Sequence, residues 1–213
     1  MDPSPEKKPW YKNIFLWYFI IGVVSLTLIR PLLRREPPPP PVVGQLPAFE
    51  LVDQSGKSFS LSDLDGNVWV VNFIFTSCPS ICPLLTDGMG KLQDRYSAYG
   101  IDGVKLLSIT VDPENDTPEV LRAYAEANEA DPERWKFLTG DSQAIRDLVL
   151  DGFRAPLGEP QETDAGLIDI MHTGEFVILD PSGGIRGYYG SDLEGLDEIY
   201  HRSRHVLREA RER

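Results

Sequence analysis

Cysteine is scarce in this chain: Cys78 and Cys82 are the only two among 213 residues. Because a structural zinc site normally takes four ligands of this kind, the absence of a second cysteine pair argues against zinc. The N-terminal region also has no cysteine that could carry a lipid. Excess positive charge is missing too, since the formal net charge is −12 and the chain beyond residue 35 carries −16. Nucleic acid is therefore not an expected partner.

The two cysteines lie four positions apart, directly after an apolar run at residues 68–75 that predicts a buried strand. A helix is expected from about residue 83 to residue 99. At such a strand-to-helix junction the helix N-terminus favours the thiolate over the thiol. Cysteines four apart in a first helical turn can share a face, close enough for a disulfide or one metal ion. Inert buried cysteines are the alternative, which the flanking prolines and the strand-end position disfavour.

A run without charged side chains, residues 14–29, precedes this region, and extending it to residue 33 gives roughly the twenty positions that a bilayer span needs. A cleavable signal peptide is the alternative, but no small-x-small cleavage site follows. We therefore expect an N-terminal tail at 1–13 and a transmembrane anchor in the lipid bilayer at 14–33. Basic residues balance on the two sides, so charge does not fix the orientation. The tail is not Arg-rich and acid-poor, which favours a bacterial source over a mitochondrial presequence.

Five consecutive prolines, Pro37 to Pro41, predict a stiff polyproline II linker of roughly 15 Å within residues 34–42. An unstructured linker is the alternative. From residue 43 to residue 213, strands and helices are expected to alternate in one α/β domain. The expected elements are a hairpin at 49–53 and 58–61, strands at 68–75, 104–111 and 135–138, helices at 83–99, 117–128 and 141–150, a hairpin at 173–179 and 185–189, and a helix at 192–208.

This order, a βαβ crossover followed by a hairpin and a helix, predicts a thioredoxin-like domain with a central mixed sheet flanked by helices and an N-terminal β-hairpin. In such folds a cis-proline ordinarily precedes the strand that faces the dithiol, yet here His172 stands before that strand and no proline does. Two soft thiolates and one neutral imidazole suit a three-coordinate copper site. A histidine before a strand is more often structural when it stands alone. His201 and His205 have arginine neighbours, so a solvated helix face is expected there.

Three segments, residues 75–83, 110–118 and 171–173, resemble the Sco/SenC family in their order and spacing. The resemblance covers roughly residues 43–208. Members of that family are membrane-anchored, thioredoxin-like copper carriers that assist assembly of the dinuclear copper site of cytochrome c oxidase. The resemblance implies that Cys78 and Cys82 are the thiolate ligands and that His172 is the histidine ligand.

The chain departs from the commonest family pattern at Ser77 and Ser80, where many relatives have a histidine or similar residue and an aspartate. The missing anionic neighbour should slightly favour the thiolate. Asp112 follows the second core strand at the sheet edge of the dithiol, where it could hydrogen-bond around the metal-binding loop. A turn or helix cap is the favoured alternative for Asp112, because Asp, Thr and Pro are common in both.

Two functions are compatible with this set of residues. A metallochaperone would hold copper, as Cu(I), Cu(II) or both, through Cys78, Cys82 and His172 and pass it to a partner such as the copper-bearing subunit of cytochrome c oxidase. A thiol–disulfide oxidoreductase would cycle a disulfide between the same two cysteines. The three-residue spacer and the missing proline disfavour the second function. We expect the copper carrier, anchored in a bacterial inner membrane with its C-terminal domain on the periplasmic side, a sidedness that the resemblance implies.

Overall fold

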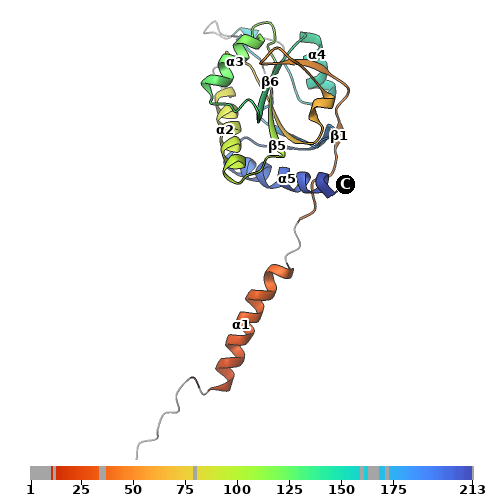
Figure 1. Cartoon of the computed structure of the whole chain (residues 1–213). Helices are drawn as coiled ribbons and strands as arrows, with labels where there is room; N and C mark the ends of the chain where they lie inside the picture. The colour runs from red at the N-terminus through yellow and green to blue at the C-terminus, as the bar shows by residue number, and fades with distance from the viewer. Residues whose placement is uncertain are drawn as a thin grey trace, which may run out of the picture. The chain divides into compact units, whose positions relative to one another are not determined.

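The computed structural model describes residues 11, 13–33, 37–78, 81–158, 161–162, 168–170 and 173–212. The chain divides into two compact units, Met1–Pro38 and Pro39–Arg213 (Figure 1). His172 and Ser80, on which two sequence predictions depend, lie outside the described residues. The predicted division into tail, anchor, linker and domain stays a prediction.

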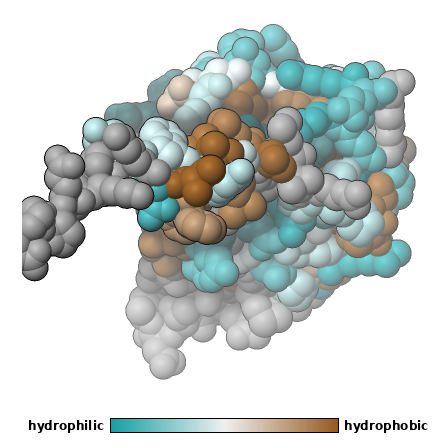
Figure 2. Space-filling view, turned by 90° about the horizontal axis from the view of Figure 1, so that it is seen from below, coloured by the Kyte–Doolittle hydropathy of each residue, from teal (hydrophilic) through white to brown (hydrophobic). Residues whose placement is uncertain are grey.

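Within its described residues, the first unit contains the helix α1 (Ile14–Leu33). It begins where the Asn13 side chain accepts a hydrogen bond from the Phe15 N–H at 3.1 Å, as an N-cap does. Figure 2 shows α1 as a group of mostly hydrophobic residues, and the Phe15 and Phe19 side chains are exposed. No helix in the part of the chain that the structure describes is both long and apolar enough to cross a membrane. The transmembrane span stays a prediction.

The second unit is built on an eight-stranded sheet with the strand order β1-β10-β9-β4-β5-β6-β2-β3. Its strands are β1 (Gly44–Gln45), β2 (Glu50–Asp53), β3 (Ser58–Ser60), β4 (Val68–Ile74), β5 (Val104–Thr110), β6 (Trp135–Thr139), β9 (Phe176–Leu179) and β10 (Gly184–Tyr189), and a separate pair is formed by β7 (Gln161–Glu162) and β8 (Ile168–Asp169). The helices are η2 (Leu61–Leu64), α2 (Cys82–Ala98), α3 (Pro118–Ala127), α4 (Ser142–Asp147), the π-helix η3 (Leu148–Gly152) and α5 (Leu193–Glu212). The predicted order of elements is confirmed.

The position of the site follows from the arrangement of the central strands β4 and β5. All seven residues of β4 are buried, as expected for a strand covered on both faces. It pairs in parallel with β5, with Ile74 opposite Thr110, and antiparallel with β9. Because parallel strands end at the same sheet edge, the chain leaves β4 and β5 side by side. Helices α2 and α5 pack on β4 and on each other, and the Tyr96 hydroxyl lies 2.7 Å from that of Ser203 between them (Figure 1).

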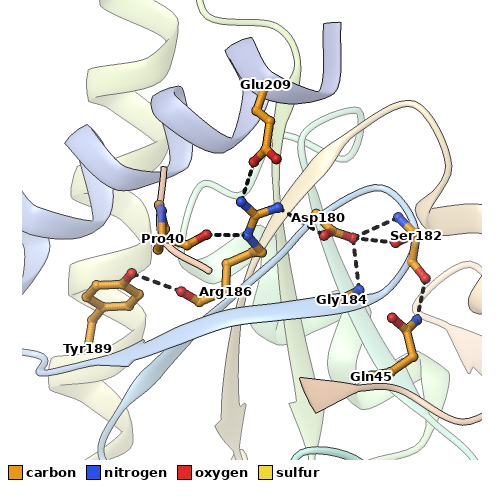
Figure 3. Close-up of polar contacts among 8 residues, drawn as sticks. All are labelled: Pro40, Gln45, Asp180, Ser182, Gly184, Arg186, Tyr189 and Glu209. Carbon is orange, nitrogen blue, oxygen red and sulfur yellow. Dashed lines mark hydrogen bonds and ion pairs between the residues drawn. The ribbon is translucent and has the colours of Figure 1, made fainter. Parts of the chain in front are cut away.

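The proline-rich segment ends on the sheet. Pro40 is buried, and its carbonyl oxygen accepts a hydrogen bond of 2.7 Å from Nε of Arg186 in β10. The same guanidinium contacts Asp180 at 3.2 Å and also Glu209 of α5 (Figure 3). Arg186 is only 4% exposed, so these partners satisfy a buried charge. The proline run therefore does not act as a free spacer over its whole length, because Pro40 is already part of the second unit.

Candidate functional site

The two cysteines come together at the junction of β4 and α2. Cys82 is the first residue of α2, whereas Cys78 lies before the helix, in a turn where its N–H donates to the Phe75 carbonyl at 3.1 Å. Their side chains hydrogen-bond to each other, and the two cysteines are not joined by a disulfide. The exposed fractions are 7% for Cys78 and 1% for Cys82. The pair is adjacent as predicted, but the two cysteines do not share a helical turn, because α2 begins at Cys82 and Cys78 precedes it.

Burial controls the charge of the inner thiol. Desolvation raises the pKa of Cys82 far above its ordinary value, and a backbone hydrogen bond with Phe75 opposes this only in part. The Cys78 side chain and the buried carboxylate of Asp116 raise the pKa of Cys82 further. The expectation that the helix N-terminus favours a thiolate is therefore wrong for Cys82. A metal cation would reverse this balance, because a coordinating thiol is deprotonated.

The segment that follows His172 packs on the loop between the cysteines. Thr173 is buried, and a Cβ atom on Gly174 would lie only 2.6 Å from Cδ1 of Ile81, which is one residue before Cys82. Residue 172 itself lies outside the described residues. Its role as a ligand stays a prediction.

Asp112 closes the turn after β5. Its carboxylate accepts hydrogen bonds from Nδ2 of Asn115 at 2.8 and 3.1 Å, and its carbonyl accepts one from the Asp116 N–H at 2.9 Å. Thr117 then caps α3, with Oγ1 accepting from the Val120 N–H at 3.4 Å. These contacts match the turn-and-cap interpretation. An additional role of Asp112 around a metal stays a prediction.

Asp116 is a site residue that the sequence analysis missed. It is 1% exposed, and its carboxylate accepts hydrogen bonds from the N–H and Oγ1 of Thr76 at 3.0 and 2.5 Å and from Oγ1 of Thr110 at 2.5 Å. Burial raises the pKa of Asp116, and these hydrogen bonds oppose the effect. The signal in the sequence was a threonine at or just beyond the end of each parallel strand, with an acidic residue shortly afterwards.

A cavity of about 460 Å³ gives access to the outer cysteine. It lies along α2 and the end of α3 and is lined by Thr76, Cys78, Pro83, Thr86, Asp87, Gly90, Lys91, Gln93, Asp94, Tyr124, Asn128 and Glu129. Cys82 is not among these lining residues. A molecule entering the cavity would therefore meet Cys78 before Cys82.

Within the described residues, no group of three or more His, Cys, Asp or Glu side chains is placed to hold a metal ion. The predicted set of Cys78, Cys82 and His172 includes one residue outside that part of the chain. His201 lies on the exposed face of α5, 3.6 Å from Asp197, as expected for a solvated helix face.

The fold and the dithiol together define a thioredoxin-like domain with a CxxxC pair at the junction of its first core strand and the following helix. A sequence model of the family described as SCO1/SenC matches residues 41–208, and the chain belongs to this family. The SCO1 protein homolog of Bacillus subtilis is 36% identical over 157 residues, which are 73% of this chain and 79% of that protein. The predicted family is confirmed.

Solved structures of Sco proteins have a similar fold to this chain. One is BsSco, described as a member of the Sco family of cytochrome c oxidase assembly proteins with a disulfide switch. It has a TM-score of 0.70 and 30% identity, covering 82% of this chain and 99% of BsSco. Bradyrhizobium japonicum ScoI with copper bound has a TM-score of 0.65 and 25% identity, covering 76% of this chain and 99% of ScoI. The predicted thioredoxin-like fold is confirmed.

Proposed function

We propose that this protein is a copper metallochaperone that binds one copper ion through Cys78, Cys82 and His172. The observation that carries the proposal is the pair of thiols packed together at the strand-to-helix junction of a SCO1/SenC domain. Soft thiolates with an imidazole suit copper, and B. japonicum ScoI is a relative solved with copper bound. Copper is the cargo, so the protein is not an enzyme in this proposal.

The unequal burial of the thiols suits uptake and release. Burial raises the pKa of Cys82, so the metal-free site holds a proton there that copper must displace. Copper binding should therefore release protons and strengthen as the pH rises. Cys78 lines the open cavity, so it is the ligand that a partner's thiolate would reach first during ligand exchange.

The support for the histidine ligand is the position of His172 in the SCO1/SenC match, together with the packing of Gly174, two residues later, on Ile81 beside Cys82. The test is a copper titration of the full chain followed by absorption and EPR spectroscopy. We expect one tightly bound copper ion per chain and a thiolate-to-copper charge-transfer band that His172→Ala weakens or shifts. His201→Ala is the matched control, since His201 is exposed on α5. Absence of specific copper binding would reject the proposal.

We infer that the copper is delivered during cytochrome c oxidase assembly, to the dinuclear copper site of the copper-bearing subunit. The support is membership of the SCO1/SenC family and the description of BsSco as a cytochrome c oxidase assembly protein. Copper-loaded protein mixed with the metal-free subunit should lose its charge-transfer band while the subunit gains copper. A Cys78→Ser protein should transfer none. Retention of copper by the wild-type protein would contradict delivery.

We further propose that residues 14–33 anchor the protein in a bacterial inner membrane, with residues 1–13 as a tail, 34–42 as a linker and 43–213 as the periplasmic domain. The support is the uncharged run at 14–29, which forms most of α1. The full chain should resist alkaline extraction from membranes, and a chain that lacks residues 1–38 should be extracted. Protease added to spheroplasts should digest the domain. Its protection there would place the domain on the other side.

A thiol–disulfide oxidoreductase is the second candidate. The observation that favours it is the hydrogen bond between Cys78 and Cys82, together with the disulfide switch described for BsSco. Oxidation of the two thiols would release two electrons and two protons to a partner disulfide, which becomes two thiols. Rapid turnover of a disulfide substrate with glutathione as reductant, unaffected by His172→Ala, would favour this function over copper delivery.

A further inference from the structure

We infer that Asp116 is a positioning residue that fixes the turn carrying Cys78, an inference that rests on the proposed copper function for its consequence but not for its geometry. Asp116 belongs to neither strand nor helix, yet it is 1% exposed. A carboxylate buried this deeply needs hydrogen-bond donors. It finds them on the two segments that end beside the dithiol.

The contacts of Asp116 use both carboxylate oxygens. Oδ1 accepts from Oγ1 of Thr76 at 2.5 Å, and Oδ2 accepts from the Thr76 N–H at 3.0 Å and from Oγ1 of Thr110 at 2.5 Å. The Thr76 N–H and the two threonine hydroxyls all donate hydrogen bonds, and an ionised carboxylate can only accept them. Hydrogen bonds to an ionised group are among the stronger ones in proteins. Asp116 therefore ties Thr76 to the end of β5.

The tie acts where the sheet ladder stops. Strand β4 ends at Ile74, whose carbonyl accepts from the Val111 N–H at 2.8 Å, and Thr76 lies two residues farther on. The Thr76 N–H lies beyond the end of β4 and donates to the Asp116 carboxylate instead of to a neighbouring strand. Two residues later Cys78 closes its turn on the Phe75 carbonyl at 3.1 Å. The position of the outer thiol thus depends on a tether at Thr76 and on one turn hydrogen bond.

Asp116 is also fixed from its own side. Its N–H donates to the Asp112 carbonyl at 2.9 Å, and the next residue, Thr117, caps α3. The backbone of Asp116 is thus fixed by the turn before it and by the start of α3 after it. Its carboxylate in turn fixes Thr76, two residues before Cys78. This arrangement preorganises the outer ligand, so the metal site does not have to order the turn when copper arrives.

The test compares Asp116→Asn with Asp53→Asn in the full chain. Asp53 is 5% exposed and also accepts three hydrogen bonds, from Ser55 and Lys57 in the β2–β3 turn. Two readouts are measured: the rate at which iodoacetamide alkylates the metal-free thiols, and copper affinity by chelator competition. For Asp116→Asn we expect alkylation about tenfold faster and copper binding about tenfold weaker, a change of about 1.4 kcal/mol in binding free energy. Asp53→Asn should lower thermal stability and leave both readouts within threefold of wild type.

The outcomes separate this inference from the proposed function. If the wild-type protein binds no copper, the copper proposal fails, but the alkylation rate still tests Asp116. If Asp116→Asn does not fold, Thr76→Val removes the hydroxyl from the tether and should itself speed alkylation. A double-mutant cycle between the two positions should be non-additive. Folded Asp116→Asn with wild-type alkylation and copper affinity, or folded Thr76→Val with wild-type alkylation, would overturn the inference.

Discussion

Replacing Arg186 by methionine should destabilise the second unit strongly, because it removes the only cation of a buried cluster among the described residues. The guanidinium donates to the Pro40 carbonyl at 2.7 Å and to Asp180 at 3.2 Å, and it contacts Glu209 (Figure 3). Methionine keeps much of the apolar stem while removing the charge. The two carboxylates would then lie close together without their shared partner.

The magnitude follows from burial. The side chains of Arg186 and Asp180 are 4% and 8% exposed, and that of Glu209 is 24% exposed. Removing one partner of a buried ion pair typically costs about 3–5 kcal/mol. Asp180 keeps hydrogen bonds from Ser182 and Gly184, so we expect the lower part of that range. A loss of about 3 kcal/mol in the free energy of unfolding corresponds to a fall of about 10 °C in Tm for a domain of this size.

The assay is thermal unfolding of the full chain followed by near-ultraviolet circular dichroism. Arg202→Met is the matched control, because Arg202 pairs with Glu198 at 3.2 Å on the surface of α5, with 35% and 48% of their side chains exposed. Such a pair contributes about 0.3–0.5 kcal/mol. If Arg186→Met lowered Tm no more than Arg202→Met, the cluster would not stabilise the fold as argued. Faster proteolysis near Pro40 in Arg186→Met would show that the linker is released as well.

Three further predictions test the turns, the glycines and the inner thiol. Burial raises the pKa of Asp180, but hydrogen bonds from neighbouring groups outweigh it and hold this pKa below its usual value. The stabilisation is therefore present above about pH 4 and lost as the pH falls through the folded-state pKa, so the difference in unfolding free energy between wild type and Asp180→Asn should shrink in acid. A constant difference would contradict this. Gly195→Ala should lower Tm because its Cβ would lie 2.1 Å from a backbone oxygen, whereas Gly90→Ala, with no atom within 4 Å, should add about 0.5–1 kcal/mol to helix stability. Equal Tm values for the two variants would refute the packing argument. In Cys78→Ser the remaining Cys82 should resist iodoacetamide at pH 8, since burial raises its pKa. Rapid alkylation there would disprove the burial argument.

The sheet could be predicted from the sequence because its signals are local. The apolar run at 68–75 becomes β4, Val68–Ile74, and the apolar run at 104–111 becomes β5, Val104–Thr110. The start of α3 was predictable to within one residue, since Asp116 or Thr117 before Pro118 is a helix-start pattern, and Thr117 is the cap. In each case neighbouring residues carry the information.

Helix ends were less predictable because distant residues decide them. A helix was expected at 141–150, yet α4 ends at Asp147 and the chain continues as the π-helix Leu148–Gly152. At Gly152 a Cβ would lie 3.1 Å from Pro47, a residue far away in the sequence. The last helix runs to Glu212 instead of 208, and the contact of Glu209 with Arg186 lies in the added turn. No local pattern contains that contact.

At the site, too, the sequence predicted which residues come together but not the environment around them. Spacing in the sequence correctly brought Cys78 and Cys82 together, but it suggested that a helix dipole would ionise them. In the structure Cys82 is 1% exposed, and desolvation, with smaller contributions from Cys78 and buried Asp116, raises its pKa. Burial depth is a tertiary property, and so is the tether from Asp116 to Thr76, which joins residues 40 positions apart. The raised pKa of Cys82 is therefore produced by the packing around the CxxxC pair, and the motif alone could not reveal it.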